Sequence, residues 1–141
     1  MTIDQTIGDL QNEFASFPDW EERYSHIISM GKGLAPYNEE YRNDEFKVKG
    51  CQSQVWLHPS ITDGTIHFEA DSDALIVKGL VALLMRVYNE RTPTEILNAP
   101  PDLVSRLGLD QHLSNNRANG LASMLKQIKL YALVYSMTRT T

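Results

Sequence analysis

Residues 55–70 carry the feature that most limits what this chain can fold into. Apolar residues alternate with other residues on both sides of Asp63-Gly64. Because both central positions of a type I′ turn need positive φ, Asp-Gly between two alternating segments predicts a β-hairpin. Pairing about this turn places these apolar side chains on one face: Val55, Leu57, Pro59, Ile61, Ile66, Phe68 and Ala70. An antiparallel hairpin with one apolar face must pack that face on a core.

The opposite face of the hairpin is expected to face away from the core, and it includes Trp56 and His58. A short third strand is expected just before the hairpin. Phe46 and Val48 alternate with polar residues there, and the segment ends at Gly50. The sheet is therefore predicted to be a three-stranded antiparallel meander.

Helical periodicity dominates the rest of the sequence. Helices are expected over residues 3–17, between 19 and 31, over 74–88, from 93 onward, over 102–107 and from 114 to 135. The helix over 74–88 is apolar nearly all round and should be the most buried element. Residues 136–141 are expected to fray. Because strands and helices are segregated along the chain, the predicted fold class is α+β, a three-stranded antiparallel sheet packed against helices in one domain spanning 1–141.

Composition narrows the functional classes. A chain of 141 residues that is 42% hydrophobic can bury one core without disulfides or metal. The formal charge of −5 offers no basic footprint for nucleic acid. No segment has the roughly 20 consecutive apolar residues that would span a bilayer, and no secretory leader is visible, so we expect a cytoplasmic protein. Protein or small-molecule partners are the expected ones.

Several kinds of chemistry find no support in the sequence. A structural metal or cluster site normally needs about four Cys or His ligands, and here one cysteine accompanies four scattered histidines. His58 and His67 are near cross-strand neighbours, but two such residues are expected to be ordinary polar strand positions facing solvent. No glycine-rich phosphate-binding motif is present, which removes support for nucleotide chemistry.

Cys51 is the only cysteine, and it lies at the expected junction between two strands. Gly50 precedes it, and the polar segment 52–54 follows. From the residues alone, a lone cysteine is more often a small buried hydrophobe than a nucleophile. A junction loop next to a glycine favours chemistry only modestly. No particular histidine is placed beside Cys51 by the sequence, so both interpretations stay open at this point.

Three motifs resemble those of a known protein family, and this resemblance favours the interpretation of Cys51 as a reactive residue. Residues 50–56, with the sequence GCQSQVW, resemble the signature around the active cysteine of the SufE family. Residues 71–80 resemble the family's DSD-x-x-IVKGL segment, and residues 113–121 are similar to its LTxxRxxGL helix start. Segments 19–24 and 92–96 also fit. The matches follow in order over nearly the whole chain.

This resemblance implies a fold shared with iron-sulfur scaffold proteins of the IscU type. It also implies a function, in which Cys51 accepts a persulfide sulfur from a cysteine desulfurase and passes it on for iron-sulfur cluster assembly. The implied partners are a SufS-type desulfurase and, downstream, a SufBCD-type scaffold. Pyridoxal phosphate belongs to the desulfurase, so the chain is expected to have no cofactor or metal of its own and to act as a transfer partner rather than a stand-alone enzyme.

The resemblance also suggests roles for single residues. Cys51 would be the attacking thiolate. Arg117 is either an ordinary exposed arginine or a support for that thiolate. Asp73 either caps the central helix or tunes the cysteine loop, and Trp56 is either core packing or an interface anchor. A buried Cys51 would have to swing outward on docking, which predicts movement of residues 50–53.

Two alternatives to sulfur carrying remain. A desulfurase activator could act by docking alone, with Cys51 incidental. An iron-sulfur scaffold on the same fold would need three or four cluster ligands, which one cysteine does not supply. The sequence leaves open whether the chain forms a homodimer.

Overall fold

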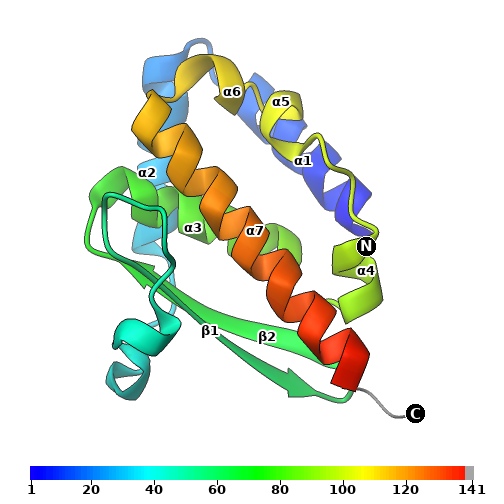
Figure 1. The fold of residues 1–141 in the computed structure, drawn as a ribbon. Helices are drawn as coiled ribbons and strands as arrows, with labels where there is room; N and C mark the ends of the chain where they lie inside the picture. The colour runs from blue at the N-terminus through cyan, green and yellow to red at the C-terminus, as the bar shows by residue number, and fades with distance from the viewer. Residues whose placement is uncertain (139–141) are drawn as a thin grey trace.

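The computed structural model describes residues 1–138 and has an α+β fold, as predicted (Figure 1). Its elements, in chain order, are α1 (Ile3–Ala15), α2 (Trp20–Lys32), the 3-10 turns η1 (Glu39–Tyr41) and η2 (Asp44–Phe46), β1 (Val55–Thr62), β2 (Thr65–Ser72), α3 (Leu75–Tyr88), α4 (Pro93–Leu97), α5 (Leu103–Arg106), α6 (Leu109–His112) and α7 (Asn115–Thr138). The last helix continues to Thr138, so residues 136–138, which were expected to fray, are helical. The remainder of that expected tail, residues 139–141, lies outside the described residues.

The hairpin forms in the predicted register. Ile61 lies opposite Ile66, and Leu57 lies opposite Ala70. Asp63 and Gly64 have φ values of 52° and 83°, the positive values that a type I′ turn requires. The side chains predicted to share the apolar face at Val55, Leu57, Ile66, Phe68 and Ala70 are all buried. The alternation in the sequence therefore fixes both the register and the inward face.

The predicted third strand is wrong. Among residues 1–138 the sheet has two strands, β1 and β2. Asn43 accepts a hydrogen bond from the Glu45 amide at 3.0 Å, which stabilises the 3-10 turn η2 where the strand was expected to begin. A single bridge between Lys47 and Trp56 is all that remains of the pairing. Alternation over so few residues does not show whether a segment forms a strand or only an isolated β-bridge.

Helix α3 is the most buried element, as predicted, because it packs on several sides. It contacts β2, α1, α2 and α7. Figure 1 shows α7 running the length of the molecule beside it. Buried apolar residues of both strands and of all seven α-helices within residues 1–138 join one core cluster. No helix within residues 1–138 is long and apolar enough to cross a bilayer.

The outer face of the hairpin is covered at Trp56 and His58, which corrects the expectation that these positions face solvent, whereas His67 on the same face is exposed as predicted. The ring of Tyr41 stacks on His58 with centroids 3.5 Å apart, and the Arg42 guanidinium lies 4.7 Å from the Trp56 ring centroid. Burial lowers the pKa of His58. Aromatic residues in the segment before β1 thus supply a small second layer. Trp56, at 7% exposure, is packed rather than free as an interface anchor.

An ion-pair network fastens this outer layer to the sheet. Arg42 donates to Asp71 at 2.9 Å, and Lys78 lies 3.2 Å from the same carboxylate. Burial acts to raise the pKa of Asp71. Hydrogen bonds from Arg42, the Ser72 amide and Lys78 outweigh burial and keep that pKa below its ordinary value. The segment leading to Cys51 is therefore anchored to the end of β2.

Helices α2 and α3 approach closely at two glycines. A Cβ added at Gly79 would lie 2.2 Å from the Ile27 carbonyl oxygen, and one at Gly31 would lie 2.7 Å from the Gly79 amide nitrogen. These are backbone atoms, so no side-chain rotation relieves the clash. The packing of α3 on α2 therefore requires glycine, which has no Cβ, at both positions.

Gly79→Ala should therefore lower the free energy of unfolding by about 2 kcal/mol or more, measured by urea denaturation, because α2 and α3 must separate. Gly8→Ala is the matched control, since a Cβ at Gly8 of α1 meets nothing within 4 Å. That change should raise stability by about 0.5–1 kcal/mol through helix propensity. Equal effects of the two substitutions would contradict the close-approach explanation.

Candidate functional site

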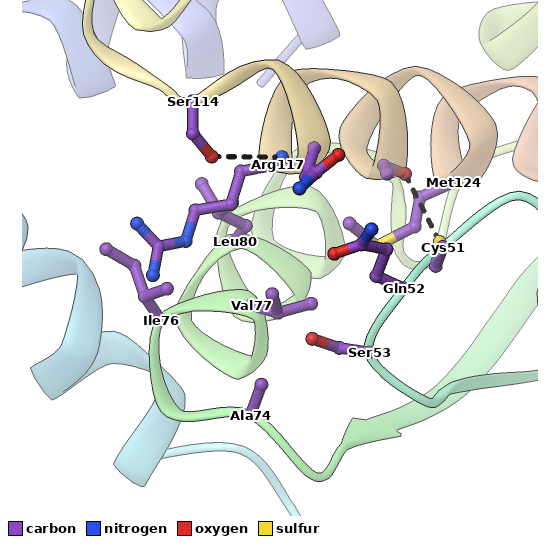
Figure 2. A pocket seen from close by; sticks show the side chains of 12 residues that line it. Cys51, Gln52, Ser53, Ala74, Ile76, Val77, Leu80, Ser114, Arg117 and Met124 are labelled. Atoms are coloured by element: carbon purple, nitrogen blue, oxygen red, sulfur yellow. Dashed lines mark hydrogen bonds between the residues drawn. The ribbon is translucent and has the colours of Figure 1, made fainter.

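Cys51 lies in the loop that leads into β1, against the backbone of α7. Its Sγ donates a hydrogen bond to the carbonyl oxygen of Gly120 at 3.6 Å (Figure 2). A Cβ placed on Gly120 would lie 3.6 Å from this sulfur. The thiol is thus partly buried against α7. The sequence left the burial of Cys51 open, and the structure places the thiol in this partly buried position.

Gly50 allows the loop to reach α7. Its φ is +89°, in the region that L side chains rarely adopt. A Cβ at this position would also lie 2.5 Å from the Ser123 hydroxyl oxygen. The backbone conformation therefore favours glycine before Cys51, and any side chain there would also displace the Ser123 hydroxyl.

A cavity of about 290 Å³ opens beside the thiol. The cysteine loop, the first turns of α3 and the N-terminal part of α7 form its walls. The lining residues are Cys51, Gln52, Ser53, Ala74, Ile76, Val77, Leu80, Ser114, Asn116, Arg117, Gly120 and Met124. The three sequence motifs over 50–56, 71–80 and 113–121 thus converge on one cavity, although they lie far apart in the chain.

Burial raises the pKa of the Cys51 thiol above its ordinary value. A thiol with a raised pKa is protonated near neutral pH, and the thiolate is the nucleophile. The observed arrangement therefore holds Cys51 in an unreactive form. It suits protection of the sulfur more than immediate attack.

Arg117 lines the same cavity but does not face the sulfur. Its backbone amide donates a hydrogen bond to the Ser114 hydroxyl at 3.3 Å, so Ser114 caps the N-terminus of α7. Figure 2 shows the guanidinium pointing away from Cys51 and toward Ile76. Support of the thiolate by Arg117 stays a prediction, and it would require the arginine or the cysteine loop to move.

Asp73 connects the cysteine loop to α3. Its carboxylate accepts hydrogen bonds from the Gln54 amide at 3.0 Å and from the Gln54 side chain at 3.3 Å. The Ser72 hydroxyl adds a bond to the Gln54 carbonyl at 2.8 Å. Helix α3 begins after Ala74 without a side-chain cap. Asp73 therefore holds the end of the loop rather than capping the helix, and its effect on Cys51 chemistry stays a prediction.

Metal-binding residues do not gather around the thiol. Within residues 1–138, no group of three or more Cys, His, Asp or Glu side chains is placed to hold an ion. His58 is stacked against Tyr41, and His67 pairs with Glu90. Each of these two histidines thus has its own neighbour.

Two parts of the site were missed from the sequence. Gly120 lies in the motif over 113–121, and the sequence does not indicate that its carbonyl accepts the thiol hydrogen bond. Ser123 and Met124 border the loop and the cavity from the next turn of α7. A glycine at position 120 within a motif could have indicated a close approach of another segment to α7. Nothing in the sequence indicated that Ser123 or Met124 borders the site.

Comparison with known proteins identifies the family. Residues 8–132 match the family described as SufE, Fe-S metabolism associated domain. The chain belongs to the SufE family. An uncharacterised SufE-like protein of Rhizobium meliloti is 42% identical over 133 residues, covering 91% of this chain and 92% of that protein. One from Synechocystis is 36% identical, covering 96% and 86% of the two chains.

The fold of this SufE-family chain also matches a solved structure. The solution structure of a hypothetical protein from Thermus thermophilus superposes with a TM-score of 0.78 at 19% identity, covering 94% of this chain and 97% of that one. At this identity the likeness shows a shared fold. Family membership itself associates the chain with Fe-S metabolism.

Alkylation of Cys51 by iodoacetamide should rise with pH along a curve whose midpoint lies above that of the same chain unfolded in urea. Burial disfavours the thiolate in the folded state, so its pKa is raised and less thiolate is present at pH 7–8. The unfolded chain is the control for intrinsic reactivity. A folded-state midpoint below the unfolded one would show that a nearby cation, and not burial, dominates.

Asp73→Ala should increase the alkylation rate of Cys51 several-fold at fixed pH, because the Gln54 end of the loop loses its two carboxylate contacts. Asp73→Asn keeps one acceptor for the Gln54 amide and should give a smaller increase. Asp9→Ala, at an exposed position on α1, is the matched surface control. If Asp73→Ala and Asp9→Ala react alike, Asp73 does not hold the loop.

Proposed function

We propose that this chain is a sulfur carrier in which Cys51 accepts a persulfide sulfur from a SufS-type cysteine desulfurase and delivers it for iron-sulfur cluster assembly. One observation carries the proposal. The only cysteine borders a cavity to which all three SufE motifs contribute residues. Membership of a family associated with Fe-S metabolism also supports this proposal.

The transfer is one thiol–disulfide exchange. The Cys51 thiol first loses its proton, and the thiolate attacks the outer sulfur of the donor cysteine persulfide. A new S–S bond forms at Cys51 while the donor S–S bond breaks. The donor cysteine leaves as a thiolate and takes up a proton. No external oxidant or reductant is needed, because the sulfane sulfur keeps its oxidation state.

The resting position of Cys51 suits storage more than attack. Its hydrogen bond to Gly120 and its raised pKa both favour the protonated thiol. Outward movement of residues 50–53 would break that bond and return the thiol to water, where more thiolate forms at neutral pH. Docking of the donor is therefore the event that would make Cys51 reactive, and retreat into the cavity would shield the persulfide from reductants.

The partners follow from this chemistry. The desulfurase carries pyridoxal phosphate, which generates the persulfide, and a SufBCD-type scaffold would receive the sulfur afterwards. The carrier itself supplies one thiol and needs no cofactor. A reducing cytoplasm would keep this thiol available between cycles.

Cys51→Ser should fold as the parent does but acquire no sulfur when incubated with a SufS-type desulfurase, pyridoxal phosphate and cysteine. Intact-mass spectrometry should show the parent chain gaining the mass of one or more sulfur atoms, all removed by dithiothreitol. Stimulation of the desulfurase, followed by alanine or sulfide production, should be lost in the variant.

Circular dichroism and urea unfolding provide the folding control for Cys51→Ser. If the variant still stimulates the desulfurase fully, the chain acts by docking alone and the carrier function is wrong. If the parent gains no sulfur while the desulfurase is active on cysteine alone, the proposed donor class is wrong.

A further inference from the structure

A second hollow lies on the other side of the cysteine loop, between residues 45–50 and α7. This groove has a volume of about 480 Å³. Lys47 and Lys49 line it from the loop, and Lys126 lines it from the helix. Gly50, which directly precedes Cys51, lies at one end of the lining, and Leu130 is among its α7 residues.

The groove carries net positive charge, although the chain as a whole carries net negative charge. Three lysines face one carboxylate, Glu45, in the lining, so the local balance is 3 − 1 = +2, against −5 for the whole chain. All three lysines are exposed, and none forms an ion pair with the residues described, 1–138. The last acidic residue of the sequence is Asp110, so α7 itself carries no carboxylate side chain.

An exposed apolar stripe continues from the groove along α7. It consists of Leu130, Leu133, Val134 and Met137, which are 48%, 43%, 47% and 75% exposed. Spacings of three and four residues place these side chains on one helix face. Leu130 belongs to both the groove and the stripe. Apolar residues clustered on one exposed face, with positive charge beside them, are typical of an interaction surface.

The groove adjoins the loop that carries the thiol, because Gly50 lines it. Along α7, Gly120 contacts Cys51, Ser123 lies against Gly50, and Lys126 and Leu130 follow at spacings of three and four residues. From Gly120 to Leu130 the helix rises about 15 Å. A protein segment lying in the groove would therefore end beside residues 50–51, the part of the loop that must move to expose the sulfur.

We infer that the groove and the α7 stripe form the docking surface for the cysteine desulfurase, and that they bind a segment with acidic side chains and an apolar anchor. Carboxylates would pair with Lys47, Lys49 and Lys126, and the anchor would cover Leu130 and the stripe. Occupation of the groove pushes on the segment that carries Gly50, which couples docking to release of Cys51. This inference rests on the proposed function for the identity of the partner.

Binding can be measured separately from sulfur transfer. A SufS-type cysteine desulfurase that is active on cysteine alone is titrated into fluorescently labelled Cys51→Ser protein, which cannot accept sulfur, and the dissociation constant is obtained from anisotropy. Lys126→Glu should weaken binding about tenfold and reduce its dependence on salt, because a like charge then faces the carboxylates. Leu130→Ser should weaken binding by a similar factor.

Matched controls are available on other faces of the molecule. Lys32→Glu reverses an exposed lysine at the end of α2, and Leu97→Ser replaces a partly exposed leucine of α4. Both should bind as the parent does. With Cys51 restored, loading of Lys126→Glu by a small polysulfide donor should match the parent, because that reaction needs no docking surface.

The outcomes separate the two proposals. If the parent is loaded but the groove variants bind as the lysine and leucine controls do, the docking surface is wrong and the carrier function stands. If no loading occurs but the groove variants still weaken binding, the surface stands and the carrier function fails. Absence of both binding and loading overturns both. Sedimentation that shows a dimer abolished by Leu130→Ser, with desulfurase binding unchanged, would assign the stripe to a second copy of the chain and also overturn the inference.

Discussion

The burial of α3 is the constraint on which the rest of the structure depends. This helix is apolar nearly all round, so neighbours must cover it on every side, and the hairpin, α1, α2 and α7 do so. The cover on the α2 side is close enough that Gly31 and Gly79 leave no room for a Cβ. Because α3 is fixed, its first turn becomes a fixed wall of the cavity, and α7 is held where its backbone can meet the cysteine loop.

Under the proposed function, the site reconciles two opposing needs of a sulfur carrier. A persulfide has to be hidden from reductants, but the thiol that accepts it has to be reached by a donor. Partial burial of Cys51 meets the first need and raises the thiol pKa as a consequence. The second need falls on a loop that is anchored at both sides, by Arg42 and Asp71 before it and by Asp73 and Gln54 after it. Only the short segment between these anchors is left to move, which confines any motion to the residues around the sulfur.

Charge is segregated along this chain in a way that matches the geometry. All carboxylate side chains lie before residue 111, whereas α7 carries only basic and neutral side chains. The net charge of the chain is negative although the groove is positively charged. Net charge describes the whole molecule, whereas recognition depends on the local electrostatic field. The same helix therefore contributes the hydrogen-bond acceptor for the thiol, one wall of the cavity and a basic, partly apolar surface.

The sequence by itself determined the hairpin register, the burial of the central helix, the α+β class, the family and the single thiol. These follow from local periodicity, turn chemistry and motifs, which act over a few residues. The structure alone decided that segment 44–46 is a 3-10 turn, that Trp56 and His58 are covered, that Asp73 holds Gln54, and that Arg117 points away from Cys51. The 3-10 turn depends on a local side-chain hydrogen bond from the Glu45 amide to Asn43, and the other three depend on which distant residues meet across the fold. Alternation predicts which way a strand faces, but only the packed tertiary structure decides what lies on the other side of it.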